Sequence, residues 1–264
     1  MEKLHHELWI VQAVNTVLGP VAAAILRALG RPVPDPAHVI PDYLAIIIVI
    51  VAGLTVLSLV VRSRLSVEDP GRLQIVFEDA MSGLHGLLDD WVGPKGRRYV
   101  PLVGTLAIFI WVSNMAGMVP GLMAPTSTLN VTLGCAITVV VYYHYQGVKE
   151  QGLGRYLLHF AMPPGSPAAM APLMFFLEVI SHCARVLSLS IRLFGNIFGE
   201  ELVILILASI IPFVVPLPMM FLGLLTGTLQ AAIFTILTMV YLGGAVASEH
   251  DHEDVHGHEA AAHP

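Results

Sequence analysis

Long apolar runs separated by short polar stretches dominate the pattern of this chain. A run of about 20 helical residues is enough to cross a hydrocarbon core about 30 Å thick. Five runs approach or exceed that length: residues 42–62, 101–121, 129–147, 172–211 and 217–247. Membrane-crossing strands would instead show short segments of alternating polarity. The pattern therefore predicts an all-α, polytopic membrane protein with about five membrane helices.

Two other stretches mix apolar and polar positions. Residues 5–29 do so unevenly, with an expected interruption at Gly19-Pro20, and we interpret them as interfacial. Residues 71–93 place apolar side chains at three- and four-residue spacings against acidic ones, which favours a helix on the membrane surface or against a partner. The apolar positions of that second stretch are Leu73, Val76, Phe77, Met81, Leu84, Leu88 and Trp91.

These patterns divide the chain into three parts. Residues 1–41 form an N-terminal segment without the features of a cleaved leader, and residues 42–248 form the membrane domain. The tail, residues 249–264, is polar and rich in histidine and acids, so we expect it to be disordered. Its histidines could bind a metal, but a solvated low-complexity tail is the simpler interpretation.

Composition and charge agree with a membrane location. Hydrophobic residues make up 56% of the 264 residues and charged ones only 12%. Most basic residues follow the first and third apolar runs, so the positive-inside rule places those two connections in the cytoplasm. They are Arg62, Arg64, Arg72, Lys95, Arg97, Arg98, Lys149 and Arg155. The N-terminus is then expected outside and the C-terminus in the cytoplasm.

The run at 172–211 is unusually long. It contains no internal proline, and as one helix it would extend about 60 Å at 1.5 Å per residue. Such a helix fits the membrane only with a tilt near 60°, beyond the usual limit of about 40°, unless it breaks near Gly195 or Gly199. With the following run at 217–247 it predicts a long, steeply tilted helical hairpin.

Ionisable side chains lie along this hairpin. Glu178, Arg185 and Arg192 are spaced by seven residues and share one helical face. Beyond them, Glu200 lies about 80° round the helix from Arg192, and Glu201 about 180°. The same face also carries Ser181, His182, Ser188 and Asn196, and the last run adds Thr226, Gln230, Thr235, Thr238 and Tyr241. Two polar surfaces are therefore expected around the first helix of the hairpin.

A charge at the centre of a bilayer costs about 2.5 to 3.5 kcal/mol on insertion scales, so it normally faces a cavity or a partner. A purely structural Glu178–Arg185 ion pair is one alternative. Arginine cannot release its proton, whereas glutamate and histidine exchange protons with water. A path lined by glutamates on either side of Arg192 is therefore interrupted in the middle, unless a carrier moves protons past the arginine.

The stretch "RLFGNIFGEEL" closely resembles subunit a of the F-type rotary ATP synthase, and "PTSTLNVTL", "PLMFFLEVISHCARVLSLSIR" and "GTLQAAIFTILTMVYL" extend the resemblance. The resemblance implies a stator subunit with two offset half-channels that serve the carboxylates of a rotating c-ring. Arg192 would face the ring and prevent leak, Glu178 would belong to the cytoplasmic half-channel, and Glu201 to the outer one. Asn196, Gln230, Asn114 and Tyr241 also match family positions.

Departures from the family pattern concern the outer half-channel. Thr128 stands where some members carry aspartate, and Gly223 where others carry histidine. Glu200 occupies a position that is often glycine, so an ionisable group has moved between helices. Whether Glu200 or Glu201 is the main outer relay stays open.

The resemblance also implies partners: the c-subunit ring, b-type peripheral stalk subunits and the rest of the complex, in a bacterial plasma membrane. The chain lacks a G-x-x-x-x-G-K-[ST] loop, so we expect a non-catalytic subunit without cofactor, metal or nucleic acid. A secondary proton-coupled transporter is the alternative, but it would normally show an internal repeat, and we find none. An intramembrane zinc protease would need H-E-x-x-H, which is absent. The coupling ion, H⁺ or Na⁺, stays open.

Overall fold

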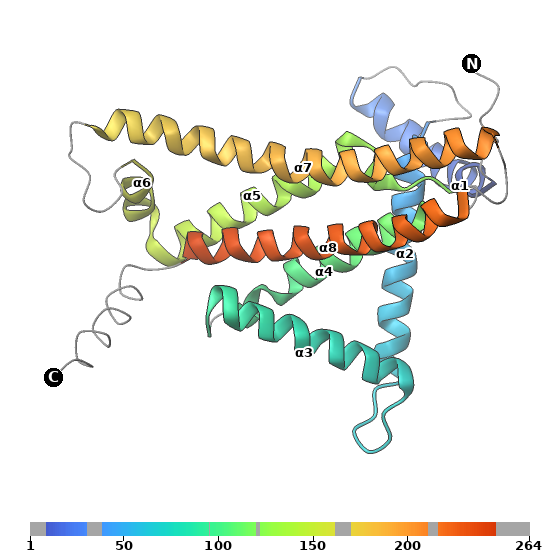
Figure 1. The fold of residues 1–264 in the computed structure, drawn as a ribbon, viewed down its shortest axis with the longest axis horizontal. Helices are drawn as coiled ribbons and strands as arrows, with labels where there is room; N and C mark the ends of the chain where they lie inside the picture. The colour runs from blue at the N-terminus through green and yellow to red at the C-terminus, as the bar shows by residue number, and fades with distance from the viewer. Residues whose placement is uncertain are drawn as a thin grey trace. The chain divides into compact units, whose positions relative to one another are not determined.

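The computed structural model describes residues 9–30, 39–94, 96–119, 122–161, 170–210 and 216–246. Every regular element in these ranges is helical, which confirms the predicted all-α fold (Figure 1). The α-helices are α1 (Trp9–Ala28), α2 (Asp42–Ser63), α3 (Arg72–Val92), α4 (Val100–Ala116), α5 (Leu129–Gln151), α6 (Leu153–Ala161), α7 (Ala171–Ile210) and α8 (Pro216–Val246). Two short 3₁₀ turns, η1 (Gly96–Tyr99) and η2 (Pro125–Ser127), precede α4 and α5. The predicted tail, 249–264, lies outside the described residues.

Five described helical segments are long and apolar enough to cross a membrane: Ile10–Ala28, Asp42–Ser63, Gly96–Ala116, Ala171–Ile210 and Leu217–Val246. The chain is therefore a multi-pass membrane protein. This set differs from the predicted one at two places. It includes the N-terminal helix, which we expected to be interfacial, and it omits α5, which we expected to cross.

The physical reasons for the two differences are local. The last part of α5 carries Tyr142 to Gln146, which lowers its mean hydropathy although the helix itself forms. In α1 the expected interruption is wrong, because the helix continues with Pro20 inside it. A proline removes only one backbone donor. Pro20 and Thr16, whose carbonyl faces the missing donor, are both exposed residues.

The predicted hairpin helices are both present. α7 is a single helix of 40 residues, without a break at Gly195 or Gly199, and α8 has 31 residues. Each begins one residue before the predicted run, at Ala171 and Pro216. Around Gly195 and Gly199 an added methyl group would meet nothing within 4 Å, so close packing against the described residues does not require these glycines.

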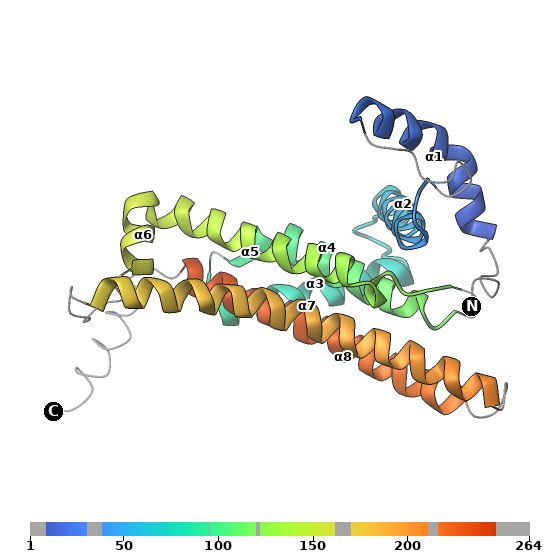
Figure 2. The same ribbon diagram turned by 90° about the horizontal axis from the view of Figure 1, so that it is seen from above.

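The chain divides into two compact units, and α7 and α8 contribute to both. The first unit consists of Met1–Glu78, Ala107–Val131 and Leu193–Ala231. In it, the second half of α7 runs beside the first half of α8 (Figures 1 and 2). Asn196 of α7 forms a hydrogen bond with Gln230 of α8, and Glu200 of α7 forms one with Thr226. The residue number of the partner on α8 therefore falls as the residue number on α7 rises. The two segments are therefore antiparallel, as expected of a hairpin.

The N-terminal part of the first unit is held by a buried amide. The Asn15 side chain accepts a hydrogen bond from the Ile40 N–H at 2.9 Å and donates to the Ile40 carbonyl at 3.1 Å. Val11, Ile40 and Ala45 form a small apolar core around it. These two hydrogen bonds satisfy the N–H and the carbonyl group of Ile40, just before α2, and so hold α1 beside that helix.

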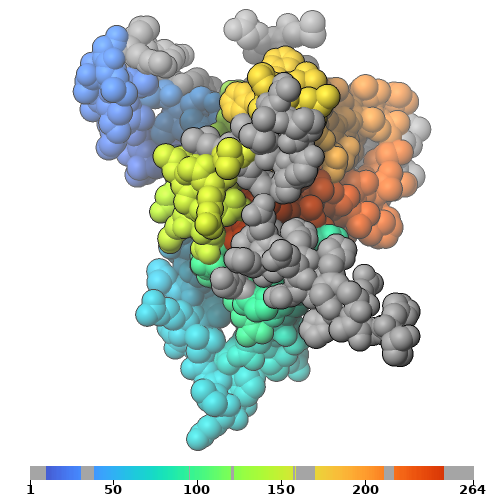
Figure 3. Space-filling view, turned by 90° about the vertical axis from the view of Figure 1, so that its left-hand side faces the viewer, coloured from blue at the N-terminus to red at the C-terminus, as the bar shows by residue number. Residues whose placement is uncertain are grey.

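The second unit consists of Asp79–Leu106, Thr132–Arg192 and Ala232–Pro264. Figure 3 shows α6 in yellow-green and the start of α7 in yellow at its surface. Gly147 of α5 allows close packing, because an added Cβ would lie 2.9 Å from the Ala245 carbonyl oxygen and would also overlap the Tyr156 ring. Gln151 of α5 donates to the same carbonyl at 3.1 Å. These contacts hold the end of α5 against α6 and the end of α8.

Candidate functional site

Arg192 lies on the outward face of α7. Its neighbours Leu189 and Leu193 are 1% and 0% exposed, whereas Arg192 is exposed. The guanidinium Nη2 donates to the Ser188 hydroxyl one turn earlier, at 3.3 Å. Within the described ranges no carboxylate forms an ion pair with it. The helix therefore carries a permanent positive charge in an apolar run without a counter-ion from the described part of the chain.

In the second unit, Glu178 is the outermost member of a hydrogen-bonded series. Its Oε1 lies 3.1 Å from Nε2 of His182, one turn further along α7. The other ring nitrogen, Nδ1, lies 2.5 Å from the hydroxyl oxygen of Tyr143 on α5. The side chains of Glu178 and His182 are 39% and 13% exposed, and Tyr143 is completely buried. The series therefore leads from an accessible carboxylate into the interior of the unit.

Arginine and aromatic side chains surround this series. The Arg185 guanidinium lies over the Tyr241 ring of α8, 5.2 Å from its centroid. Glu178 bonds His182 instead of Arg185, so the structural ion pair that we considered from sequence is not formed. A cation over an aromatic face is stabilised by the ring quadrupole. Arg185 thus supplies positive charge near the series without neutralising its carboxylate.

The buried face of the same cluster comes from α5 and α6. The ring centroids of His144 and His182 are 4.7 Å apart. Nδ1 of His144 is 2.9 Å from the Val140 carbonyl oxygen. Tyr156 of α6 packs edge-on against His144. Burial raises the pKa of Tyr156, with a smaller contribution from the nearby Glu178 charge, so its hydroxyl stays neutral at physiological pH.

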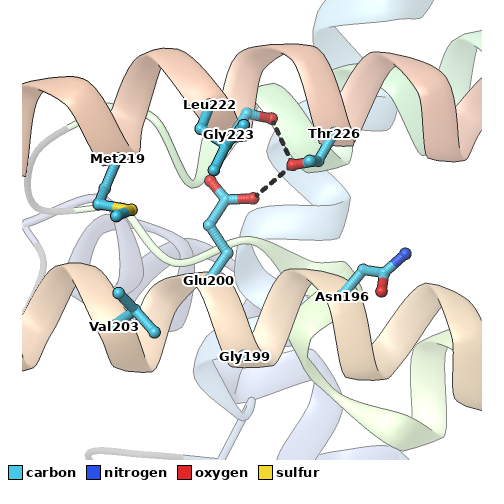
Figure 4. A pocket seen from close by; sticks show the side chains of 8 residues that line it. All are labelled: Asn196, Gly199, Glu200, Val203, Met219, Leu222, Gly223 and Thr226. Carbon is cyan, nitrogen blue, oxygen red and sulfur yellow. Dashed lines mark hydrogen bonds between the residues drawn. The ribbon is translucent and has the colours of Figure 1, made fainter.

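In the first unit, Glu200 points from α7 toward α8 (Figure 4). Its Oε2 accepts a hydrogen bond from the Thr226 hydroxyl at 3.1 Å. Its Oε1 is buried against Gly223 and finds no hydrogen-bond partner among the described residues. A cavity of about 260 Å³ adjoins the carboxyl group and is lined by Asn196, Gly199, Val203, Met219 and Leu222 besides these residues. This space is large enough for water.

Glu201 faces a different neighbour. Its Oε1 accepts a hydrogen bond from the Ala124 N–H at 2.8 Å, next to the 3₁₀ turn η2. Ala124 is completely buried, so this backbone donor has no access to water. Glu201 also lies close to Gly117, where an added Cβ would be 3.2 Å from the same oxygen. The Glu201 carboxylate therefore holds Ala124, which lies between α4 and α5, through this hydrogen bond.

Two amides complete the first unit. Asn196 donates to Oε1 of Gln230 at 2.8 Å. Asn114 of α4 is 2% exposed; it donates to the Gly227 carbonyl at 2.8 Å and accepts from the Thr126 hydroxyl at 2.7 Å. Asn114 thus links α4, α8 and η2. Gln230 is also buried, and its Nε2 lacks a partner in the described part of the chain.

The residues predicted from sequence therefore fall into two groups, one in each unit. Arg192, Ser188, Glu178, His182 and Tyr241 belong to the second unit. Asn196, Glu200, Glu201, Gln230 and Asn114 belong to the first. The sequence interpretation did not include Tyr143, His144 or Ala124. The polar cluster "YYHYQ" at the end of an apolar run was the available signal for the first two.

Continuous apolar helices that carry several ionisable side chains are typical of polytopic membrane proteins that transfer ions or protons. The family model described as ATP synthase A chain matches residues 43–243, and the chain belongs to that family. It is 46% identical over 203 residues to ATP synthase subunit a of Citrifermentans bemidjiense, covering 77% of this chain and 86% of the relative. Subunit a of Geotalea uraniireducens is 41% identical over 223 residues, covering 83% and 95%. Subunit a of Aliarcobacter butzleri is 45% identical over 183 residues, covering 69% and 79%.

Proposed function

We propose that this chain is the stator subunit a of a bacterial F-type ATP synthase. In this role it passes protons to and from the carboxylates of a rotating ring of c subunits. The relatives carry the name ATP synthase subunit a, and the family match covers most of the membrane domain. The chain itself is not catalytic, since the energy of the proton gradient reaches ATP through the other subunits of the complex.

The observation that carries the proposal is the exposed Arg192, which has no counter-ion within the described chain. A cation at such a place in a membrane requires an opposite charge from outside. A ring carboxylate, ionised beside Arg192, supplies it through a charge-assisted attraction that strengthens in low dielectric. Once protonated the carboxyl is neutral and leaves through lipid. Because arginine cannot lose its proton, protons do not pass directly along α7 and must travel on the ring.

The acids on either side of Arg192 in the sequence serve two offset half-channels. Glu178 lies fourteen residues before the arginine and belongs to the cytoplasmic half-channel, and the pair Glu200 and Glu201 follows it and belongs to the outer one. A proton driven through such a path gains about 2.3 kcal/mol per 100 mV of membrane potential. α7 fits the bilayer as a steeply tilted helix, since its length is about 60 Å.

Within the outer half-channel we assign proton exchange to Glu200. Its carboxyl group adjoins a cavity that has room for water, and among the described residues its side-chain hydrogen-bond partner is the Thr226 hydroxyl. A hydroxyl both donates and accepts, so it serves the ionised and the neutral acid equally. Glu201 instead accepts a hydrogen bond from the Ala124 N–H, a backbone group that can only donate, so this carboxyl group is held by a structural contact.

The proposed complex lies in the bacterial plasma membrane, with the N-terminus outside and the C-terminus in the cytoplasm. Its partners are the c-ring, b-type peripheral stalk subunits and the remaining subunits of the synthase. The predicted helix at 71–93 forms as α3, and several of its apolar residues, including Leu73, Val76 and Trp91, are exposed within the chain. This surface is consistent with the membrane interface or a partner subunit.

The deciding experiment replaces Arg192 with Gln in the intact complex. We expect ATP-driven proton pumping in inverted membrane vesicles to be lost, while the assembled complex is present in normal amount, because Arg192 is exposed and packs little. Arg192→Lys should rescue poorly, since a lysine ammonium is more strongly hydrated and can lose its proton. Near-normal coupled pumping by Arg192→Gln would refute the proposed function.

A further inference from the structure

The His182 ring lies between two hydrogen-bonding groups that reach it from different helices. Glu178 of α7 faces one nitrogen and Tyr143 of α5 faces the other. We propose that Tyr143 is a positioning residue for proton exchange at Glu178, because its hydroxyl fixes the orientation and the tautomer of His182. This inference rests on the proposed function, in which Glu178 exchanges protons with water.

The hydrogen-bond pattern assigns the proton on each atom when Glu178 is ionised. A carboxylate only accepts, so Nε2 of neutral His182 must carry the hydrogen and donate it to Glu178. Nδ1 is then an acceptor, and the Tyr143 hydroxyl is its donor. Because Tyr143 is completely buried, no water competes for this role.

Hydrogen bonds in such a series strengthen one another. When Tyr143 donates to Nδ1, it polarises the imidazole and makes Nε2–H a better donor to the carboxylate. A ring held at one nitrogen also keeps the other aimed at Glu178, as in other sites where the partner of one imidazole nitrogen sets the state of the second. Tyr143 therefore stabilises the ionised form of Glu178 from a distance, without contacting it.

When Glu178 takes up a proton, the same series reverses. The acid donates to Nε2, Nδ1 then carries the hydrogen, and the Tyr143 oxygen accepts it, so the hydroxyl hydrogen loses the Nδ1 acceptor that it has while Glu178 is ionised. This exchange of tautomer needs no net proton beyond the one that Glu178 has gained. Among the described residues, titratable or charged groups near the series come from four helices: Tyr143 and His144 on α5, Tyr156 on α6, Glu178 and Arg185 on α7, and Tyr241 on α8.

Tyr143→Phe removes the hydroxyl and keeps the buried ring. We expect ATP-driven proton uptake to persist, with the alkaline limb of its pH profile moved to higher pH by about half a unit or more. The limb moves to higher pH because the ionised form of Glu178 loses the support of the Tyr143 hydroxyl, which acts through His182. His182→Gln should move the limb in the same direction, and it tests the proposal even if Tyr143→Phe assembles poorly.

Tyr142→Phe is the matched control. Tyr142 is the preceding residue on α5, its ring packs edge-on against Tyr99, and it forms no part of the series. It should leave the profile unchanged. In a Glu178→Gln background, Tyr143→Phe should have no further effect on the profile, because the group it positions has gone.

Inverted vesicles containing the whole complex, with assembled subunit a measured by immunoblot, provide the profiles. A normal profile for Tyr143→Phe at normal assembly would overturn the positioning role, as would a shift that persists in the Glu178→Gln background. Arg192→Gln in the same assay separates the two proposals. If Arg192→Gln loses pumping while Tyr143→Phe matches the wild type, only the positioning role fails.

Discussion

Glu178 and Glu200 are acids on the same helix with opposite kinds of surroundings. Glu178 is held by an imidazole, which is held in turn by a buried tyrosine hydroxyl. In the described part of the chain, Glu200 meets the Thr226 hydroxyl, a glycine against its carboxyl group and a cavity beside it. The position of the Glu178 carboxyl group is set by a series of hydrogen bonds. The position of the Glu200 carboxyl group depends on the space that Gly223 and the cavity leave for it. One residue type therefore has two different kinds of surroundings on a single helix.

Glu201, directly after Glu200, extends this comparison. The two side chains leave α7 in different directions, one toward α8 and the other toward the Ala124 N–H. Adjacent helical residues point about 100° apart, so they cannot face the same neighbour. Sequence proximity to Arg192 is thus a poor guide to the surroundings of each acid.

Labelling of cysteines tests the offset of the two regions and has the largest expected effect. Cysteines at 178 and 201, in a background without Cys135 and Cys183, should react with a membrane-impermeant thiol reagent from opposite sides. Position 178 should react from the cytoplasmic side and position 201 from the outside. Labelling of both from the same side would favour a continuous, transporter-like pathway instead.

Removal of charge distinguishes the two adjacent acids. Glu200→Gln should lower ATP-driven pumping about tenfold or more, because it removes a proton-exchanging group. Glu201→Gln should retain more than about half of the activity, since its amide oxygen still accepts from Ala124. Initial rates in inverted vesicles, normalised to assembled complex, measure both. The reverse order of severity would assign the relay to Glu201.

The space over Gly223 is the subject of a third prediction. A methyl group there would overlap the Glu200 carboxyl group, so Gly223→Ala should force this side chain out of the cavity. We expect pumping to fall roughly threefold. This loss is smaller than for Glu200→Gln, because the carboxyl group is displaced but not removed. Gly244→Ala, also on α8 but with nothing within 4 Å of the added carbon, is the control and should pump normally. Equal rates for both variants would contradict this account of Glu200.

The smallest effects concern stability. Asn114→Ala removes a buried amide with two partners and should lower the free energy of unfolding by about 1 to 3 kcal/mol. In the other unit, Gln151→Ala removes a half-buried bond to the Ala245 carbonyl and should cost about 0.5 to 1.5 kcal/mol. Thermal denaturation of the detergent-solubilised complex measures the difference. A larger loss for Gln151→Ala would reverse the expected ranking.

Much of the fold is readable from local patterns. The starts of α7 and α8 follow from long apolar runs that begin at Pro172 and near Pro216 and Pro218, because proline is tolerated in the first turn of a helix. The seven-residue spacing of Glu178, Arg185 and Arg192 also places them on one face, because the direction of a side chain around its own helix depends only on residue number. The interruption at Pro20 was predicted wrongly, since an exposed helix tolerates one missing donor.

The sequence by itself therefore determined an all-helical membrane protein, the family to which it belongs, and a fixed positive charge at Arg192 among exchangeable acids. Only the tertiary structure decided that Tyr143 meets His182, thirty-nine residues away, that Gly223 makes room for Glu200, and that Glu201 fastens Ala124. Helical periodicity specifies which way a side chain points from its own axis. It contains no information on which residue of a neighbouring helix lies opposite, because that register is set by long-range packing.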